Sequence, residues 1–216
     1  MRKYEKIETV FQRDLNGSKK LLNHVFRNST VEFLAKNDWI WTEKIDGINI
    51  RIYWDGYKVT FGGRTDNAAI PTPLINKLNE LFGTEEAAQI FEQTWGEREV
   101  ILFGEGYGTK IQKVGSAYLP DDVGFILFDV LVGDNYQERS VVESVAKMFN
   151  VPIVPIIIIG SIDVACNYMK THPMSMVAEG RCEMEGLVGR PAVEMRDRCG
   201  DRIIVKIKWC DIKELI

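Results

Sequence analysis

The chain has 216 residues, of which 45% are hydrophobic and 27% are charged, and its formal net charge is −4 at pH 7. This length and composition are those of a globular protein that can bury a substantial core. The negative net charge argues against a protein that coats nucleic acid non-specifically.

Cellular location is indicated by what the sequence lacks. No apolar run is long enough to cross a bilayer, and no secretory signal follows the first six residues. The four cysteines, at positions 166, 182, 199 and 210, are widely spaced and form no C-x-x-C pair. This spacing argues against a zinc ribbon and favours a reduced protein. We therefore expect a cytoplasmic protein with no membrane partner.

The first third of the chain predicts short helices and loops, followed by a β-hairpin. Residues 1–40 carry a helix cap at Asn28 but no long periodic run. Apolar and polar side chains alternate over residues 48–54, and they alternate again after the favoured turn Asp55-Gly56. A short stretch, residues 42–47, leads into this hairpin.

The remaining chain predicts helices and strands in mixed order. The helices are expected over residues 73–82, 84–95, 138–149 and 161–170. Apolar strands are expected over residues 100–103, 125–132, 153–159 and 202–209, and one further strand begins at residue 185. Strict βαβ alternation is missing, so we predict an α+β fold with mostly antiparallel sheets flanked by helices. We find no repeat or linker and expect a single domain over residues 1–216.

Polar residues with matching chemistry lie at the ends of the predicted strands. A lysine amine attacks phosphorus only when it is unprotonated, and its ordinary pKa is about 10.4. Burial and nearby positive charge favour the neutral amine, and carboxylates suit magnesium. These residue types match nucleotidyl transfer from a triphosphate to lysine: Lys44, Asp46, Arg64, Glu105, Glu185, Lys206 and Lys208. Taken alone, Lys44 also fits a surface lysine before a turn.

Six short motifs in order make the chain resemble the covalent nucleotidyltransferase superfamily, which contains ATP-dependent ligases and mRNA capping enzymes. The resemblance runs from about residue 43 to residue 209 and implies an ATP-grasp-like nucleotidyltransferase domain. Two stretches, Arg64-Thr65 and residues 111–113, are most similar to RNA ligases of the phage and RNA-editing type. The motifs are Glu43-Lys44-Ile45-Asp46-Gly47, Arg64-Thr65, Phe103-Gly104-Glu105, Phe128-Asp129, Glu185-Gly186-Leu187-Val188 and Lys206-Ile207-Lys208.

The resemblance implies a role for each residue near the lysine and the base. Lys44 would form the lysyl-AMP phosphoramidate, and Asp46 would help to organise its motif. Glu43 would lie near the adenine edge, and Phe128 would stack on the ring. Phe125 is a competing candidate for the stacking residue, and a place in the core is the alternative reading for Phe128.

The same resemblance implies contacts to the ribose, the phosphates and a metal. Arg64 and Glu105 would contact the ribose. Glu185 would help to bind a metal, Mg²⁺ or Mn²⁺. Lys206 and Lys208 would touch the nucleotide, with Lys208 as the phosphate contact.

The implied reaction joins RNA ends in three steps. Lysine attacks the α-phosphate of ATP, AMP moves to a 5′-phosphate, and a 3′-hydroxyl then displaces AMP. The expected partners are ATP and RNA ends, including ends at a nick in a duplex. Because only residues 210–216 follow the last motif, we expect no C-terminal nucleic-acid-binding domain. An accessory protein would then hold the ends in its place.

Three alternatives stay open at this point. A small ATP-dependent DNA ligase shares the lysine motif, and the sequence does not report the sugar of the substrate. A non-catalytic relative could bind nucleic-acid ends with the same fold and no covalent chemistry. A capping guanylyltransferase would use GTP in place of ATP.

Overall fold

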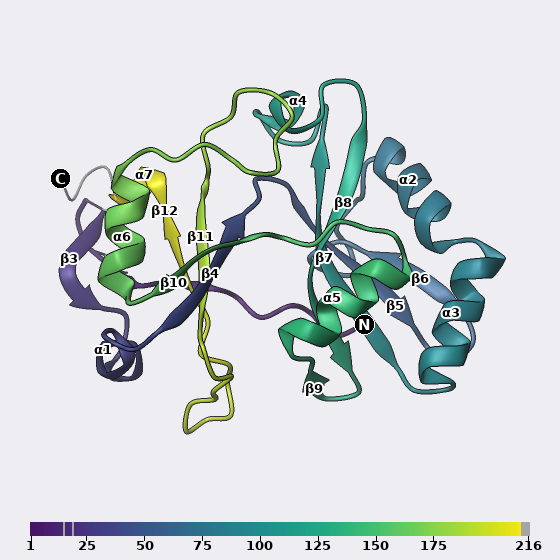
Figure 1. The fold of residues 1–216 in the computed structure, drawn as a ribbon, viewed down its shortest axis with the longest axis horizontal. Helices are drawn as coiled ribbons and strands as arrows, with labels where there is room; N and C mark the ends of the chain where they lie inside the picture. The colour runs from purple at the N-terminus through teal and green to yellow at the C-terminus, as the bar shows by residue number, and fades with distance from the viewer. Residues whose placement is uncertain (15, 19, 213–216) are drawn as a thin grey trace. The chain divides into compact units, whose positions relative to one another are not determined.

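The computed structural model describes residues 1–14, 16–18 and 20–212. The chain forms two compact units, which we describe one at a time (Figure 1). Unit 1 comprises residues 1–5, 46–154 and 178–180, and unit 2 comprises the described parts of residues 6–45, 155–177 and 181–216. Sheets in both units are predominantly antiparallel, so the α+β prediction is confirmed. None of the described helices is long and apolar enough to span a bilayer.

Unit 1 is a five-stranded antiparallel sheet with helices packed on one face (Figure 1). The strand order is β6-β5-β7-β8-β9. Its strands are β5 (Ile48–Trp54), β6 (Val59–Gly62), β7 (Val100–Gly108), β8 (Val123–Val132) and β9 (Asn135–Tyr136). Its helices are α2 (Thr72–Phe82), α3 (Glu85–Trp95), α4 (Gly115–Tyr118) and α5 (Arg139–Met148).

Helical periodicity builds the core of unit 1. On α2 the buried residues Leu74, Leu78 and Phe82 recur every four positions, so they form one apolar face. The hydroxyl of Thr84 accepts the Ala87 N–H at 3.1 Å and caps α3. These helices and α5 cover the sheet face that carries the apolar side chains of β5, β7 and β8. The opposite sheet face, called the polar face below, carries polar side chains of β5 and β7 beside a smaller apolar cluster.

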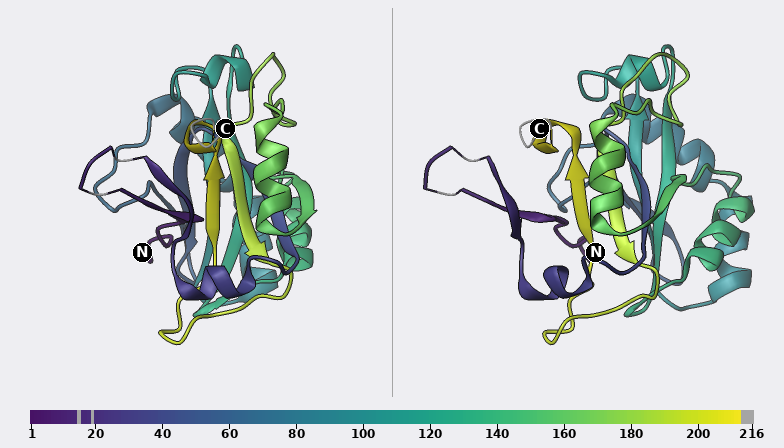
Figure 2. Two further views of the ribbon diagram at one scale, coloured as in Figure 1. Left: turned by 90° about the vertical axis from the view of Figure 1, so that its left-hand side faces the viewer. Right: turned by 60° about the vertical axis from the view of Figure 1, so that its left-hand side comes forward.

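Unit 2 is a second five-stranded sheet with the order β1-β12-β11-β4-β10. Only β1 and β12 pair in parallel within it. Helix α6 packs on this sheet, and β2 and β3 form a separate two-stranded ribbon whose apolar residues join the same core (Figure 2). Its strands are β1 (Glu8–Thr9), β2 (Phe11–Arg13), β3 (Leu21–Phe26), β4 (Trp39–Lys44), β10 (Ile156–Gly160), β11 (Gly186–Pro191) and β12 (Val205–Lys208). Its helices are α1 (Ser29–Leu34), α6 (Ile162–Lys170) and α7 (Trp209–Ile212).

Strand β4 shows why Lys44 faces away from the core of unit 2. Burial alternates along the strand, so Trp39, Trp41 and Glu43 are buried while the residues between them are partly exposed. The Trp41 indole N–H donates to the Gly160 carbonyl at 3.1 Å, which fixes β4 against β10. Lys44 therefore lies on the face opposite the two tryptophans.

Several predicted boundaries differ from the structure. Residues 1–40 contain three short strands besides α1, so the prediction of helices and loops is wrong for β1, β2 and β3. The predicted strand 100–103 continues to Gly108, because β5 and β8 pair with it along the glycines. The strand expected over 153–159 is β10, and the one expected over 202–209 is β12, which ends where α7 begins. The four predicted helices are confirmed within one or two residues. The single-domain expectation stays a prediction.

Candidate active site

The centre of the candidate site is a row of three adjacent strands in unit 2. Gly186 on β11 lies directly opposite Lys44 on β4 and also directly opposite Lys208 on β12. Directly opposed residues of an antiparallel pair share one sheet face. A Cβ at Gly186 would meet the Ile207 carbonyl oxygen. The two lysines therefore flank a position that holds no side chain.

Glu185 connects the two lysines through a single carboxylate. Its Oε2 lies 2.5 Å from the Lys44 Nζ, and its Oε1 lies 2.6 Å from the Lys208 Nζ. All three side chains are partly buried, with exposed fractions of 23% for Lys44, 18% for Glu185 and 30% for Lys208. Two ammonium groups and one carboxylate give the cluster a net positive charge, which suits a polyphosphate.

The environment of Lys208 keeps this side chain a cation. Burial acts to lower the pKa of Lys208, but the hydrogen bond to Glu185 and the nearby negative groups outweigh it. The pKa of Lys208 therefore lies above its ordinary value of 10.5. A lysine held in its charged form can bind a phosphate oxygen as a point charge.

Lys206 shares the sheet face of Lys208 but lies farther along β12. It pairs with Val188 on β11 and with Thr9 on β1. Burial alternates along β12, because Val205 and Ile207 are buried while both lysines are partly exposed. Lys206 is therefore displaced from Lys208 by two residues along β12, away from the end of β11 that carries Glu185.

Glu43 is buried and anchors a loop of unit 2. Its carboxylate accepts a hydrogen bond from the Ser175 hydroxyl, and its other oxygen accepts the Met176 N–H at 2.9 Å. Only 2% of the residue is exposed. Burial raises the pKa of Glu43, and the two hydrogen bonds partly offset this rise. The Glu43 carboxylate therefore makes a structural contact with this loop. Its place near adenine stays a prediction.

Replacing Glu43 with glutamine is expected to change how stability depends on pH. A raised folded pKa means that the folded protein keeps the Glu43 proton to a higher pH than the unfolded chain. The free energy of unfolding of the wild type therefore falls as pH rises from 4.5 through the folded pKa. Glu43→Gln lacks this titration, so the wild-type stability minus the variant stability should decrease over that range. Urea unfolding at a series of pH values measures the difference, and parallel pH curves would contradict the assignment.

Unit 1 holds the other predicted site residues near its polar sheet face. The Asp46 backbone N–H donates to the Tyr118 hydroxyl at 3.4 Å. Glu105 lies on β7 directly opposite Asn49 on β5. A Cβ at Gly47 would come within 2.8 Å of the Glu105 side chain. Glycine at this position therefore lets the backbone of the lysine motif pass beside Glu105.

A β-bulge places Phe128 on the polar face of the unit 1 sheet. Phe103 pairs with Asp129 and the next residue, Gly104, pairs with Leu127, so Phe128 is the extra residue. Its ring lies edge-on to Tyr4 at 5.0 Å, and the Tyr4 hydroxyl donates to Asp129 at 2.8 Å.

The competing aromatic, Phe125, belongs to the core. It is 1% exposed and packs on Phe82 with ring centroids 5.4 Å apart. Phe128, which is partly exposed, is thus the better candidate for a stacking residue.

The remaining predicted residue, Arg64, lies in the loop after β6. Its side chain is exposed and makes no hydrogen bond or ion pair with another residue in the described part of the chain. The loop is held instead by Arg51, a fully buried arginine that our sequence reasoning missed. The alternation of side chains along β5 predicts that Arg51 lies on its polar face, but it does not predict which residues accept the hydrogen bonds of Arg51.

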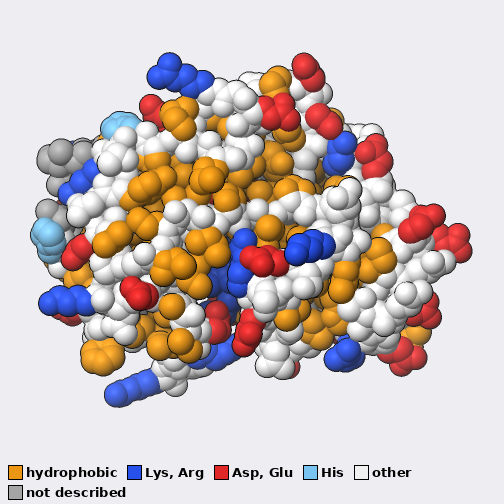
Figure 3. Space-filling view, viewed as in Figure 1, with side chains coloured by type: hydrophobic (Ala, Val, Ile, Leu, Met, Phe, Trp, Pro, Cys, Tyr) orange, Lys and Arg blue, Asp and Glu red, His pale blue; other side chains and the backbone are white. Residues whose placement is uncertain are grey.

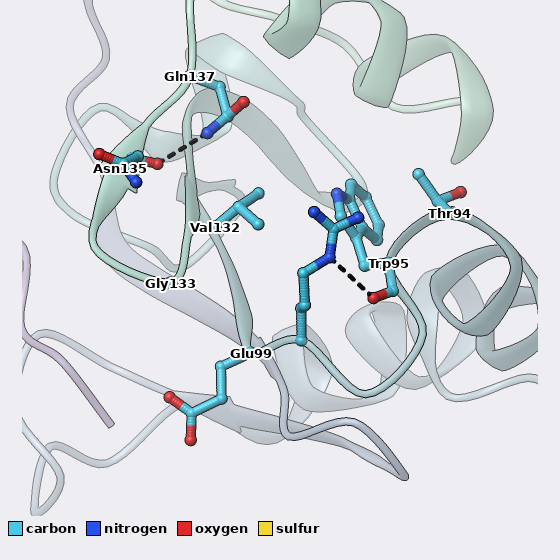
Figure 4. A pocket seen from close by; sticks show the side chains of 8 residues that line it. Thr94, Trp95, Glu99, Val132, Gly133, Asn135 and Gln137 are labelled. Carbon is cyan, nitrogen blue, oxygen red and sulfur yellow. Dashed lines mark hydrogen bonds between the residues drawn. The ribbon is translucent and has the colours of Figure 1, made fainter.

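A cavity of about 620 Å³ in unit 1 is separate from these residues (Figure 4). It lies between the end of α3 and the β8–β9 turn, and no predicted site residue lines it. Two charged side chains of its lining contact the fold: the Arg98 Nε donates to the Trp95 carbonyl, and Glu99 accepts the Tyr53 hydroxyl. Acidic side chains gather on the right-hand side of the space-filling view (Figure 3). The cavity is not the predicted nucleotide site, because none of the predicted residues lines it.

Comparisons with known proteins identify the family and the fold. A sequence model of the RNA ligase family matches residues 37–208. No curated protein sequence matches the chain.

Solved structures of the Naegleria gruberi RNA ligase share the fold. One mutant with ATP and Mn has a TM-score of 0.63 at 17% identity, over 98% of this chain and 63% of that chain. Another with ATP and Mn has a TM-score of 0.65 at 18% identity, over 96% and 56%. A mutant with AMP and Mn has a TM-score of 0.62 at 17% identity, over 96% and 62%.

These structures contain segments that the present chain does not match, because it spans less than two thirds of their length. The family match covers most of the present chain and includes both lysines and the carboxylate that joins them. The chain therefore belongs to the RNA ligase family.

Proposed function

We propose that this chain catalyses ATP-dependent joining of RNA ends through a lysyl-AMP intermediate and an adenylylated 5′ end. The cluster of Lys44, Glu185 and Lys208 within one sheet carries the proposal. It supplies one nucleophile, one carboxylate and one phosphate-binding cation, in a chain of the RNA ligase family. Phosphoryl transfer depends mainly on positioning and on charge neutralisation, which this set can provide.

The first step forms the covalent intermediate on Lys44. The Lys44 ammonium first releases a proton to water. Its unprotonated Nζ then attacks the α-phosphorus of ATP, a nitrogen–phosphorus bond forms, pyrophosphate leaves with the electron pair of the broken phosphorus–oxygen bond, and the bonded nitrogen releases a second proton to water. Lys208 binds a phosphate oxygen and stabilises the charge that develops there. AMP then passes to an RNA 5′-phosphate, and a 3′-hydroxyl displaces AMP to seal the strand.

The residues of the cluster fit a divalent metal that arrives with the nucleotide. Magnesium usually binds through one or two carboxylates together with substrate phosphates. The described residues contain no group of three or more acidic, histidine or cysteine ligands, and Glu185 offers a single carboxylate beside the phosphate-binding lysine. We propose Glu185 as the protein ligand of Mg²⁺ or Mn²⁺, which would neutralise charge on the triphosphate.

The proposal also assigns a role to each remaining predicted residue. Asp46 organises the lysine motif, and its backbone bond to Tyr118 supports that role. Phe128 stacks on adenine, and its partly exposed ring on the bulge, packed against the apolar cluster of the same sheet face, supports that role. The nucleotide-binding residues of the proposal are Glu43, Lys44, Arg64, Glu105, Phe128, Lys206 and Lys208.

RNA ends are the proposed substrate, including ends at a nick in a duplex. The chain spans only 63% of the first Naegleria structures that it matches. We also propose a cytoplasmic location and an accessory protein that helps to hold the ends. Matched nicked duplexes that differ only in the sugar at the nick would separate an RNA ligase from a DNA ligase.

The experiment that tests the function is covalent labelling followed by joining. The purified chain is incubated with Mg²⁺ and with radiolabelled ATP, GTP or NAD in parallel. We expect label to stay on the protein in a denaturing gel with ATP only, and we expect the adduct to join a 5′-phosphate to a 3′-hydroxyl RNA end. Binding of RNA ends without an adduct would instead identify a non-catalytic relative.

Exchanging the two lysines of β12 for alanine is expected to have unequal effects. Lys208→Ala removes the cation that contacts Glu185 at 2.6 Å, so adduct formation should slow by about 100-fold. Lys206→Ala removes a lysine displaced from that carboxylate, and its effect should be at least about fivefold smaller. Single-turnover labelling with ATP measures both rates. Equal losses in the two variants would contradict the assignment of the phosphate contact to Lys208.

A further inference from the structure

A buried arginine holds the loop that carries Arg64. The side chain of Arg51 is 0% exposed, although a guanidinium is costly to bury unless its donors are satisfied. Its Nε donates to the Gly63 carbonyl at 2.7 Å, and its Nη2 donates to the Asp66 carboxylate at 2.9 Å. These two acceptors stand on either side of Arg64 and Thr65. The guanidinium therefore fixes both ends of the short segment that presents Arg64.

The remaining nitrogen of the guanidinium binds a second segment of unit 1. The Nη1 of Arg51 donates to the Met1 carbonyl at 3.0 Å and to the Arg2 carbonyl at 3.3 Å. A guanidinium is planar and carries its donors in a fixed fork, so its bonds fix their acceptors relative to one another. A lysine, with one rotating ammonium, could not reproduce this arrangement.

Arg51 also has a fixed place relative to Glu105. Asn49 on β5 pairs with Glu105 on β7, and Arg51 lies two residues farther along the same strand and on the same face. Two residues of strand correspond to about 7 Å. The sheet thus sets the position of Arg51 relative to Glu105, and the guanidinium sets the loop of Arg64 relative to the sheet.

We propose that Arg51 is a positioning residue that places Arg64 at a set distance from Glu105, so that both side chains can bind the ribose of ATP. This inference rests on the proposed function, which assigns the ribose contacts to these two residues. Arg64 is exposed and forms no ion pair with another described residue. Its position therefore depends on its backbone, and the backbone is held by Arg51.

Glycine at position 62 leaves room for the guanidinium. A Cβ added there would lie 3.1 Å from the Arg51 Nη2 and 3.2 Å from the Met1 sulfur. The backbone at Gly62 has no positive φ, so alanine can adopt its conformation. Gly62→Ala therefore crowds the guanidinium without removing any of its acceptors.

The test uses Asp66→Ala, because substitution of Arg51 itself could unfold the protein. The Asp66 side chain is 61% exposed, so its loss should leave the fold intact while it frees one end of the Arg64 segment. In the labelling assay we expect the KM for ATP to rise about fivefold to tenfold, with the saturating rate within about twofold of wild type. Gly62→Ala should shift KM in the same direction, and Asp66→Glu should restore part of the loss.

A second readout is sugar selectivity, which a merely structural role would not change. If Arg64 is placed to contact ribose, wild type should prefer ATP over 2′-deoxy-ATP, and both Arg64→Ala and Asp66→Ala should reduce that preference. The Arg64→Ala/Asp66→Ala double variant should be no worse than Arg64→Ala alone, because both act through one contact. The matched control is Asp134→Ala, which breaks an exposed 3.0 Å ion pair to Arg2 in the same unit and should leave KM unchanged.

The outcomes separate this inference from the function on which it rests. If wild type forms no adduct with ATP, the proposed function fails and the inference fails with it. If Arg64→Ala raises KM while Asp66→Ala and Gly62→Ala do not, the inference alone is overturned. Additive losses in the double variant, or an unchanged KM in Arg64→Ala, overturn it as well.

Discussion

Lys44→Ala should abolish formation of the adduct between the protein and AMP, with a loss of about 10⁴-fold or more. In the proposed reaction the amine of Lys44 forms the covalent bond, and the Glu185–Lys208 pair that would remain offers no other unprotonated nucleophile in the cluster. Single-turnover labelling with ATP and Mg²⁺ measures the rate. An adduct that persists in Lys44→Ala would contradict the assignment of the nucleophile.

Lys44→Arg is the matched variant that separates chemistry from electrostatics. Arginine keeps the positive charge and can keep the ion pair with Glu185, but a guanidinium does not deprotonate in proteins. We expect this variant to be folded and as inactive as Lys44→Ala. Lys170→Ala, an exposed lysine on α6 of the same unit, should label at the wild-type rate. Activity in Lys44→Arg would show that charge at this position, and not nucleophilicity, is what matters.

Glu185→Gln should slow adduct formation by about 100-fold to 1000-fold. The substitution keeps the size of the side chain and removes the negative charge of the carboxylate. In the wild type the oxygens of this carboxylate lie 2.5 Å from the Lys44 Nζ and 2.6 Å from the Lys208 Nζ. A glutamine offers one acceptor oxygen, so its NH₂ group must face the other ammonium. The variant loses the proposed metal ligand and leaves two partly buried cations side by side. Single-turnover labelling over a range of Mg²⁺ concentrations measures the loss.

Stability provides an independent measure of the same cluster. Leaving two lysines without their shared carboxylate should lower the free energy of unfolding by about 1–2 kcal/mol. Removing one of them, in Glu185→Gln/Lys208→Met, should restore much of that stability but none of the activity. Glu183→Gln, an exposed carboxylate two residues earlier, should change neither quantity appreciably. Labelling by Glu185→Gln within tenfold of wild type would contradict the proposed role.

The sequence allowed prediction of features that depend on local periodicity. Alternation placed Lys206 and Lys208 on one face of β12, and the spacing of Leu74, Leu78 and Phe82 placed a helix on the core. The order of the motifs predicted that Lys44, Glu185 and Lys208 act together, and the structure brings these three side chains into direct contact. Local patterns are informative here because each of these elements buries one clear face.

Features that depend on distant partners could not be predicted. The short β1 has no alternating run, and it exists as a strand because it pairs with β12 almost 200 residues later. Glycines at positions 104, 106 and 108 have low strand propensity, yet β7 continues through them because strands pair on both sides. At Gly104 a side chain would collide with Phe125 across the sheet. Such contacts become visible only once the chain is folded.

Arg51 shows the same limit for the site. The alternation of side chains along β5 predicts that Arg51 lies on an exposed or polar face. The four acceptors that satisfy its buried guanidinium lie on residues 1, 2, 63 and 66. Nothing in the local sequence marks these as its partners. Glu43 is similar, because Ser175 and Met176 lie more than 130 residues away. Positioning residues of this kind are recognised from burial and hydrogen bonds.

Locating the modified amino acid is the most direct test of whether a lysine amine receives AMP from ATP. The chain is incubated with ATP and Mg²⁺, digested, and its peptides are analysed by mass spectrometry. We predict one AMP group, attached to Lys44 through a nitrogen–phosphorus bond that acid cleaves. AMP on a different residue, or a folded protein that binds ATP and stays unmodified, would contradict the account.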